Sequence, residues 1–465
     1  MSRARPPRPA HLISASFALA VVLGAGVFFL RASAPPGPPV RGDILVLLQD
    51  GKFSSLEAML TGYETKYEDD HSALPWTEAA FRSFANSDSA LEPRLNAWIE
   101  KMPNSYAARL ARASFLGHLG ALSRGGALAA DTPRERFEDM RDFNALAAKD
   151  YTKAIALDPK LTLAYAGLAD MARISGARDE AQHFLAEGLR FDPKSPLLHW
   201  TFLLTLEPKW GGSLTEIRDY LAALKQRYPA DITLAGLQSF AEFVSGDAAL
   251  RGGDYEGALN HFDRAIASDG ARIAYLEEHA DADFMRDHYE DASAAILRAL
   301  ALDPDDAALH YRLSEYRLFE KRLDAALASA DKAVGLDRLN PTYLDQRATV
   351  LRMMGRHEEA VRDLDDAAIY GGFDARIQID RSAELLRFET RLKDSVSAAR
   401  RATELAPHDA DAWAQYVQAL WFAQDCGARQ ALQVFNAVCH PDSDCAKEHE
   451  LIAPSLIPMM DCHGS

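Results

Sequence analysis

The chain has 465 residues, of which 48% are hydrophobic and 26% are charged, and its formal net charge is −17. The apolar content is normal for a folded protein, which argues against a disordered body. The acidic balance argues against a nucleic-acid partner, because such a protein needs a basic surface that neutralises phosphates. It favours partners that are basic or neutral.

The N-terminus has the pattern of a membrane anchor. Residues 1–11 form a basic segment, and Leu12–Leu30 is uncharged and mostly apolar. This run has about 19 residues, enough for one helix to cross a bilayer, whereas the apolar core of a signal peptide usually has about 7–15. Pro35 and Pro36 directly follow Ala32–Ala34, which resembles a cleavage site. The sequence therefore predicts an uncleaved transmembrane anchor or uncleaved signal at residues 12–30, with a cleaved signal as the alternative.

The arginines predict the orientation of the chain. Those that precede the span should stay on the cytoplasmic side, so residues 1–11 are expected in the cytoplasm. Everything after Arg31 is then expected outside it, in the periplasm or an equivalent extracytoplasmic space, on a single-pass protein of the cytoplasmic membrane. Residues 31–43 form a proline-rich linker that cannot continue the membrane helix.

Residues 44–131 are predicted to form an N-terminal helical domain, because apolar residues recur at helical spacing and Gly51 breaks the first run. Helical segments are expected at Ile44–Tyr67, Trp76–Phe84 and Leu91–Ile99. Ser105 is placed to cap the helix that follows. The glycine-rich stretch Leu119–Asp131 is expected to interrupt that helix.

A small residue recurs further along the chain at steps of about 34 residues. It stands at Ala154, Gly188, Ala265, Ala299, Ala333, Ala367 and Ala402. Each lies in the second helix of an expected helical hairpin, as in Leu344–Ala367, and small side chains allow neighbouring hairpins to approach closely. On this evidence the chain resembles the tetratricopeptide repeat family. The resemblance implies an all-α fold, an α-α superhelix of tetratricopeptide type over residues 132–407, and a role in binding other proteins.

One stretch departs from the repeat pattern. In Ser195–Pro229 the turn is lengthened at Lys209–Ser213, and Ile217 and Leu224 stand where the repeat prefers small residues. Because larger side chains hold helices apart, we expect the two helices of this unit to be forced apart and the superhelix to be locally irregular.

A second resemblance concerns the first part of the body. The stretches LQDGKFSSLEAMLTGYETKYEDD, SYAARLARASFLGHLG and PKWGGSLTEI are similar to a bacterial family of exported or anchored tetratricopeptide-like proteins. The defining domain of that family has no assigned activity. The resemblance covers most of Ile44–Pro229 and brings no catalytic residues to this chain.

The C-terminal residues 408–465 are predicted to form a capping hairpin and a cysteine-containing tail, and all the cysteines of the chain lie in this segment. A solenoid needs a cap over its last apolar face. The cysteines are Cys426, Cys439, Cys445 and Cys462. An even number in one short segment of an exported protein predicts two disulfides, with three possible pairings. A metal site that uses His440, His449 or His463 is the alternative, but the spacing lacks a Cys-x-x-Cys pattern.

No constellation in the sequence predicts catalysis. The zinc-protease, phosphate-loop and serine-hydrolase motifs are missing, so we expect no enzyme, no cofactor and no metal. The turn Gly211–Ser213 could meet an anion, but a turn with an N-capping serine is the simpler interpretation. The acids at 303, 305 and 306 fit the start of a helix better than a metal loop. The histidines at 279, 288, 310 and 357 lie on different repeats or helices and are expected at surface or packing positions.

The exposed positions of each first helix should line a concave groove, the usual binding place of such a fold. These positions are Glu277, Asp281, Phe284, Tyr311, Glu315, Phe319, Asp345, Thr349, Arg352, Asp380, Glu384, Arg387 and Phe388. Acids outnumber bases, so we expect a basic or mixed protein segment as partner, with Tyr311, Phe319 and Phe388 as apolar anchors. An ordinary solvated face is the alternative.

These features together predict a non-enzymatic scaffold that is anchored in the membrane and holds partner proteins of an envelope or secretion assembly. Two other functions are open. The protein could recruit or regulate a cell-envelope enzyme such as a cell-wall synthase or hydrolase. Residues 44–131 could also contain an active site that no known motif reveals, which a closed pocket with titratable groups would indicate. The sequence does not define the partner, the process or the oligomeric state.

Overall fold

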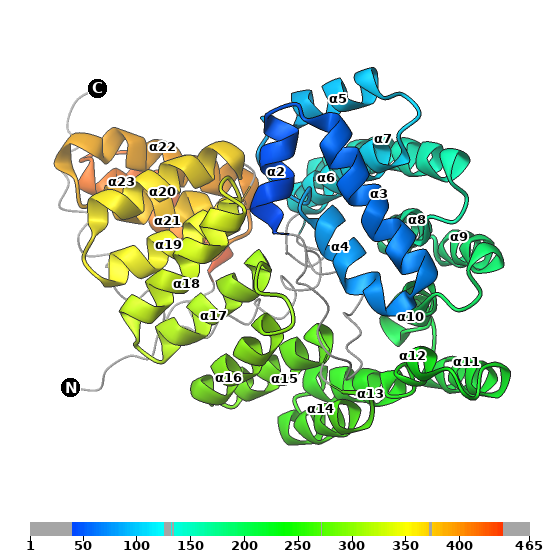
Figure 1. The fold of residues 1–465 in the computed structure, drawn as a ribbon. Coiled ribbons are helices and arrows are strands. Elements are labelled where there is room, and N and C mark those ends of the chain that lie inside the picture. The colour runs from blue at the N-terminus through cyan, green and yellow to red at the C-terminus, as the bar shows by residue number, and fades with distance from the viewer. Residues whose placement is uncertain (1–39, 125–131, 133, 271, 372–373, 440–465) are drawn as a thin grey trace. The chain divides into compact units, whose positions relative to one another are not determined.

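The computed structural model describes residues 40–124, 132, 134–270, 272–371 and 374–439 (Figure 1). Every regular element in these ranges is a helix, which confirms the predicted all-α class. The described residues divide into two compact units between Arg322 and Leu323, which we call the N-terminal unit and the C-terminal unit. Within the described ranges no helix is long and apolar enough to cross a membrane. The predicted span Leu12–Leu30 lies outside them, so the anchor stays a prediction.

The N-terminal unit begins with the helices expected from the sequence. They are α2 (Arg41–Gln49), α3 (Phe53–Asp69), η1 (His71–Ala73), α4 (Leu74–Arg82), α5 (Leu91–Lys101), α6 (Tyr106–Arg124) and α7 (Arg134–Leu157). Gly51 turns the chain between α2 and α3 with a φ of 68°, and the Ser105 hydroxyl accepts the Ala108 N–H at the start of α6. Two boundaries differ from the prediction. α2 starts within the proline-rich linker, and α6 continues into the glycine-rich stretch as far as Arg124.

The expected domain boundary at residues 131 and 132 does not separate two bodies. Helices α6 and α7, which flank it, pack against each other as a hairpin. A single apolar core runs from Ile44 to Ala282. The reason is that α6 buries apolar residues along much of its length, and α7 covers part of that surface. The N-terminal helices and the first repeats therefore form one unit.

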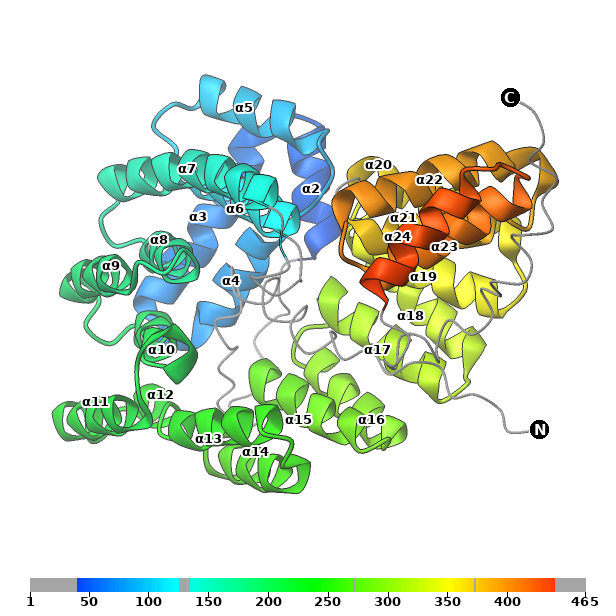
Figure 2. The ribbon, with the colours of Figure 1, turned by 180° about the vertical axis from the view of Figure 1, so that it is seen from behind.

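The N-terminal unit continues through a further series of helices. They are α8 (Thr162–Ile174), α9 (Arg178–Phe191), α10 (Pro196–Thr205), η3 (Pro208–Trp210), α11 (Leu214–Arg227), α12 (Ile232–Ala235), α13 (Phe240–Arg251), α14 (Tyr255–Asp269), α15 (Ile273–Met285), α16 (Tyr289–Leu300) and α17 (Ala307–Phe319). α8 pairs with α9, α13 with α14, and α15 with α16 (Figure 2). Polar residues begin several of these helices, as Asp306 does by accepting the N–H groups of residues 308 and 309.

In the stretch that the sequence predicts to be irregular, α10 and α11 contact each other through aromatic side chains. Their contact includes stacked rings, with Phe202 and Tyr220 4.6 Å apart between centroids. His199 Nδ1 also lies 2.6 Å from the Tyr220 hydroxyl. Ile217 and Leu224 are buried, and the irregularity of the superhelix stays a prediction. After α11 the short helix α12 leads into α13, and the regular hairpins resume.

The recurring small residues are buried at helix contacts. A Cβ atom added to Gly188 would lie 2.8 Å from Leu198 Cδ1 and 2.9 Å from Tyr165 Cγ. We expect Gly188→Leu to lower the free energy of unfolding by about 1–3 kcal/mol, because the extra atoms overfill this contact. Ala186→Leu is the matched control, since Ala186 is exposed on the same helix, and should change stability by less than about 0.5 kcal/mol. Chemical denaturation monitored by circular dichroism measures both, and equal stabilities of the two variants would contradict the role of the small residue.

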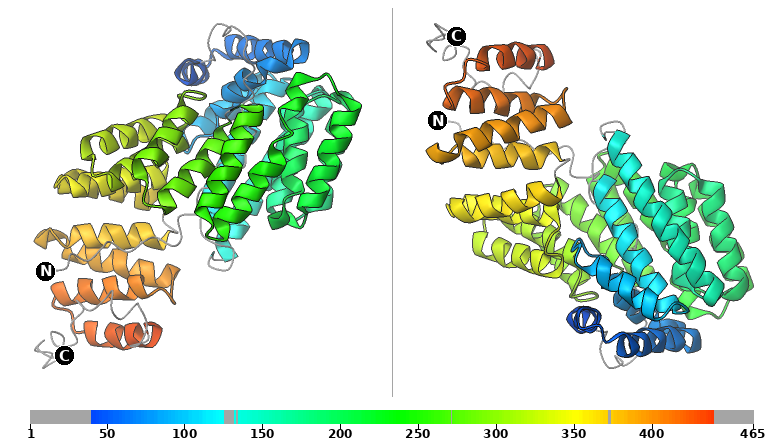
Figure 3. Two further views of the ribbon diagram at one scale, coloured as in Figure 1. Left: turned by 90° about the horizontal axis from the view of Figure 1, so that it is seen from below. Right: turned by 90° about the horizontal axis from the view of Figure 1, so that it is seen from above.

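The C-terminal unit contains the remaining hairpins, stacked side by side in Figure 3. Its helices are α18 (Leu323–Leu336), α19 (Pro341–Met353), α20 (His357–Tyr370), α21 (Ala375–Leu385), η4 (Glu389–Arg391), α22 (Leu392–Leu405), α23 (Ala410–Phe422) and α24 (Ala428–Val438). α23 and α24 pack together around Val417, Leu420 and Phe435, and Val396 of α22 packs against the same cluster. This final hairpin thus covers an apolar face of the preceding one, as a cap would.

Cysteines lie at the end of the C-terminal unit. Cys426 and Cys439 are both disulfide-bonded, and no cysteine of the described residues is free. Cys445 and Cys462 lie outside the described residues. The pairing of the four cysteines therefore stays a prediction.

Candidate protein-binding surface

The predicted groove residues lie on the first helices of their hairpins or just beyond them. Glu277, Asp281 and Phe284 are on α15, and Tyr311, Glu315 and Phe319 are on α17. In the C-terminal unit, Asp345, Thr349 and Arg352 are on α19, Asp380 and Glu384 are on α21, and Arg387 and Phe388 follow it. Only Arg387 is exposed, Glu384 is buried, and the others are half-buried. The structure thus places these side chains in polar networks, and their use by a partner stays a prediction.

Arg312 organises the network on the N-terminal unit. This arginine of α17 pairs with Asp281 of α15, and its Nη2 donates to the Tyr316 hydroxyl at 2.6 Å. That hydroxyl donates to Asp281 Oδ1 at 2.8 Å. Glu277 lies one turn before Asp281, and burial raises its pKa to about 7, although Arg312 opposes the shift. The repeat pattern predicted the two acids as groove residues but not Arg312, whose positive charge offsets their negative charge.

Helix α4 brings further charges to this network from far away in the sequence. Arg82 pairs with Asp303 and lies 3.8 Å from Asp306, both in the loop before α17. Glu78 is also on α4, and it is 1% exposed with no hydrogen bond to either carboxylate oxygen. Burial raises the pKa of Glu78 well above its ordinary value, against the effect of Arg82. Because α4 and this loop are more than 200 residues apart, no local pattern in the sequence could predict the contact.

The aromatic residues of this face pack against one another. Phe284 makes an edge-to-face contact with Phe319 at 4.9 Å and stacks with Tyr316 at 5.1 Å between ring centroids. Tyr289 lies 5.3 Å from Phe319. Phe319 therefore belongs to an aromatic cluster within the unit. The cluster gives it a fixed position, which lowers the entropy that an anchor loses on binding.

In the C-terminal unit, two aspartates of neighbouring hairpins form the centre of the face. Arg352 Nη1 lies 3.6 Å from Asp380 Oδ1, and Arg376 Nε lies 3.9 Å from Asp380 Oδ2. Burial raises the pKa of Asp345 well above its ordinary value, and the charge of Asp380 raises it further. Burial raises the pKa of Asp380 as well, although both arginines oppose this. The two carboxylates thus share one site in which ionisation of one disfavours ionisation of the other.

Next to these aspartates, a buried glutamate bridges two hairpins. Glu384 Oε1 lies 2.5 Å from His357 Nδ1 of α20, and Glu384 Oε2 accepts from Arg387 Nε at 3.3 Å. His357 was expected at a surface or packing position, and the structure pairs it with a groove residue. Thr349 and Phe388 are half-buried on the same face.

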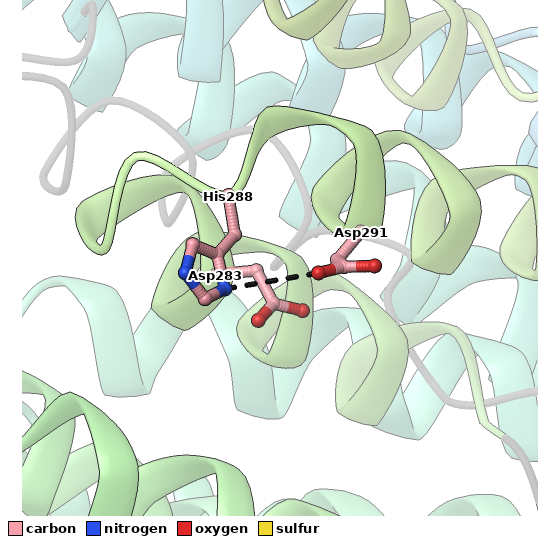
Figure 4. A group of neighbouring side chains, drawn as sticks. All are labelled: Asp283, His288 and Asp291. Atoms are coloured by element: carbon pink, nitrogen blue, oxygen red, sulfur yellow. Dashed lines mark ion pairs between the residues drawn. The ribbon is translucent and has the colours of Figure 1, made fainter.

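Asp283, His288 and Asp291 form a group around the α15–α16 turn that has the spacing of a metal site (Figure 4). One ligand atom of each lies within 4.8 Å of the others, and His288 Nδ1 is 3.7 Å from Asp291 Oδ2. Asp283 Oδ2, however, lies 3.1 Å from His279 Nδ1. Burial alone would lower the pKa of His279, but Asp283 and Asp263 together raise it. A cationic histidine on Asp283 would repel a metal ion, so the arrangement fits an ion-pair network better than a metal site.

Two solved structures are similar to this chain over different shares of its length. The APC/C hetero-tetramer Cut9-Hcn1 covers 89% of this chain and 90% of its own, with 13% identity and a TM-score of 0.45. TTC0263, a thermophilic TPR protein in Thermus thermophilus, covers 39% of this chain and 98% of its own, with 21% identity and a TM-score of 0.34. TM-scores this low do not establish a shared fold.

Sequence comparisons match parts of the chain. The DnaJ homolog subfamily C member 7 homolog of Schizosaccharomyces pombe (strain 972 / ATCC 24843) is 26% identical over 168 residues, which are 33% of this chain. The match spans about a third (34%) of the length of that curated relative. Residues 41–187 match a family model described as a domain of unknown function, DUF4034. This match runs from α2 into α9, across the expected boundary at residue 131, and so follows the continuous core of the N-terminal unit.

Proposed function

We propose that this protein is a non-enzymatic scaffold that binds a basic or mixed segment of a partner protein on the first helices of its C-terminal hairpins. The observation that carries the proposal is the pair Asp345 and Asp380. These acids stand at the same place in successive hairpins, are half-buried, and have raised pKa values. A cationic side chain of a partner would relieve the repulsion between them.

The sequence supports a place for this scaffold in the cell envelope. A membrane anchor at Leu12–Leu30 and the proline-rich linker after it would display both units on the extracytoplasmic side of the cytoplasmic membrane. The clustered cysteines fit an oxidising compartment. The partner in this proposal is a protein of an envelope or secretion assembly, and a cell-envelope enzyme that the scaffold recruits is the second possibility.

The experiment is crosslinking in living cells, followed by purification of the tagged full-length protein and identification of the proteins that accompany it. The test variant is Asp345→Asn with Asp380→Asn, which removes both charges and keeps the side-chain size. We expect it to fold and to bind the recovered partner about 30-fold more weakly, as for a loss of about 2 kcal/mol.

Asp366→Asn is the matched control, because Asp366 is an exposed aspartate on α20 of the same unit. It should bind the partner as the unchanged protein does. Equal binding by the double variant and by this control would contradict the proposed surface. Recovery of an envelope enzyme as the main partner would favour recruitment over assembly.

A further inference from the structure

We infer that a groove between α5 and α7 is a second protein-binding site, and that it takes an acidic amphipathic helix. The groove has a volume of about 700 Å³ and is lined by residues of α5, α6 and α7 only. It lies entirely within the part of the chain that matches the domain of unknown function. It shares no residue with the groove that the sequence predicts, so it goes beyond the function proposed above.

Basic residues outnumber acidic residues in the lining of this groove, although the chain as a whole carries a net charge of −17. Four of the lining residues are basic and two are acidic. One acid, Asp150, is 2% exposed and already neutralised. Arg112 donates to it from Nε at 2.6 Å and from Nη2 at 2.9 Å, and Arg109 donates from Nη1 at 2.9 Å. The two guanidinium groups and one carboxylate leave a net positive charge on the floor of the groove.

Two lysines of α7 extend this basic surface, and a hydrogen bond from Arg112 connects it to α5. Lys149 and Lys153 are exposed and lie one turn apart on α7, where they border the groove. Arg112 Nη1 donates to Asn96 Oδ1 of α5 at 2.7 Å, and this bond fixes the arginine between the two walls. Glu92 is the one acid that is exposed in the lining. A ligand in the groove therefore meets positive charge along the α7 wall.

Apolar side chains lie beside the cations. Leu116 of α6 is buried at the floor, and Leu146 of α7 is 47% exposed at the rim. Ala145 and Ala148 have small side chains that leave space next to them. A ligand must therefore present an apolar stripe flanked by acidic groups, which is the pattern of an amphipathic helix with Leu on one face and Glu beside it.

A helix suits the openness of the groove better than a small molecule does. Half of the lining residues are exposed, namely Glu92, Ala145, Leu146, Lys149, Thr152 and Lys153. Small-molecule sites usually enclose about 70–90% of the ligand surface, whereas a helix in a groove buries one face and leaves the other in solvent. Charge complementarity selects the acidic helix over a basic one.

The test uses full-length protein and a fluorescent helical peptide of about 18 residues, with Leu at i, i+3, i+4 and i+7 and Glu on both sides of that stripe. A second peptide with Lys in place of every Glu is the specificity control. We expect saturable binding of the Glu peptide and binding of the Lys peptide that is weaker by at least about tenfold.

The protein variant is Lys149→Glu with Lys153→Glu, which reverses two exposed charges and should leave the fold intact, as circular dichroism checks. It should weaken binding of the Glu peptide about tenfold or more. Lys332→Glu with Lys393→Glu is the matched control, since both lysines are exposed on the C-terminal unit, and it should bind as the unchanged protein does. The Asn variants of Asp345 and Asp380 should also bind normally, which keeps this test separate from that of the proposed function.

Three results would overturn the inference. One is no saturable binding of the Glu peptide by the full-length protein, and another is equal binding by the variant with both lysines reversed. The third is binding of laurate at this groove without binding of the peptide, which would assign the site to a small amphiphilic acid.

Discussion

Replacing Glu64 with glutamine is expected to make the protein more stable by on the order of 4 kcal/mol at pH 8 and to leave its stability almost unchanged near pH 4. Glu64 is on α3, its side chain is 2% exposed, and neither carboxylate oxygen has a hydrogen bond. Burial is the main cause that raises its pKa to about 8, and the charges of Glu68, Asp158 and Asp192 raise it further.

The direction of the pH effect follows from where the proton is bound. In the unfolded chain a glutamate releases its proton near its ordinary pKa of 4.5, whereas in the folded protein Glu64 keeps its proton up to about pH 8. Between these values the folded state binds more protons than the unfolded state, so the unchanged protein loses stability as the pH rises. Glutamine resembles the protonated carboxyl group and cannot ionise, so the variant avoids this loss.

The measurement is denaturant unfolding of the N-terminal unit at a series of pH values, monitored by tryptophan fluorescence, since Trp98 and Trp200 are buried in that unit. Glu100→Gln is the matched control, because Glu100 is an exposed glutamate on α5 of the same unit and does not act on Glu64. Its pH profile should follow that of the unchanged protein. Parallel profiles for Glu64→Gln and the unchanged protein would show that Glu64 ionises normally in the folded state.

Replacing Asp170 with alanine is expected to destabilise the N-terminal unit by about 3–5 kcal/mol, because it leaves a buried arginine without its counter-ion. Arg173 Nη2 lies 3.0 Å from Asp170 Oδ1 on α8, and the two side chains are 1% and 10% exposed. The guanidinium group also stacks over Trp210, with 4.7 Å from Cζ to the ring centroid. Burial raises the pKa of Asp170 even though Arg173 opposes it.

Two further variants separate the lost charge pair from lost packing. Asp170→Leu combined with Arg173→Met removes both charges and fills a similar volume, so it should recover most of the stability. Glu187→Ala breaks a pair of the same i,i+3 spacing with Arg190 on α9, and those side chains are 40% and 72% exposed. It should cost less than about 0.5 kcal/mol. If the double variant were as unstable as Asp170→Ala, the loss would come from packing and not from the unpaired charge.

The positions of the helices could be predicted from the sequence because the signals are local. Gly51 and Ser105 mark a turn and a helix start through their own backbone geometry and hydrogen bonds. The extent of α6 was underestimated, because its glycines are judged poor helix formers on their own. In the structure, α7 packs along this helix, and a Cβ atom on Gly120 would lie 3.3 Å from Phe143 Cβ. Packing against α7 therefore keeps this stretch helical, although helix propensity alone would end α6 earlier.

Only some of the candidate binding residues could be predicted from the repeat period. The period placed Asp345 and Asp380 at equivalent positions of successive hairpins, and the structure brings their charges together. It did not reveal that Arg312 neutralises Asp281 or that His357 contacts Glu384. The repeat period also gave no sign of the basic groove at Arg109. Its cations come from two different helices, α6 and α7, and neither helix has a distinctive charge pattern by itself.

The sequence by itself determined the all-α class, the order of the hairpins and the small residues that separate them, because a periodic pattern of apolar and small side chains is a local property. The tertiary structure alone decided that the N-terminal helices and the first repeats share one core, that Arg82 meets Asp303, and that α5 and α7 leave a basic groove over α6. The physical reason is that these features depend on contacts between helices far apart in the chain. Such contacts are selected by the burial of whole surfaces and by the pairing of charges inside them.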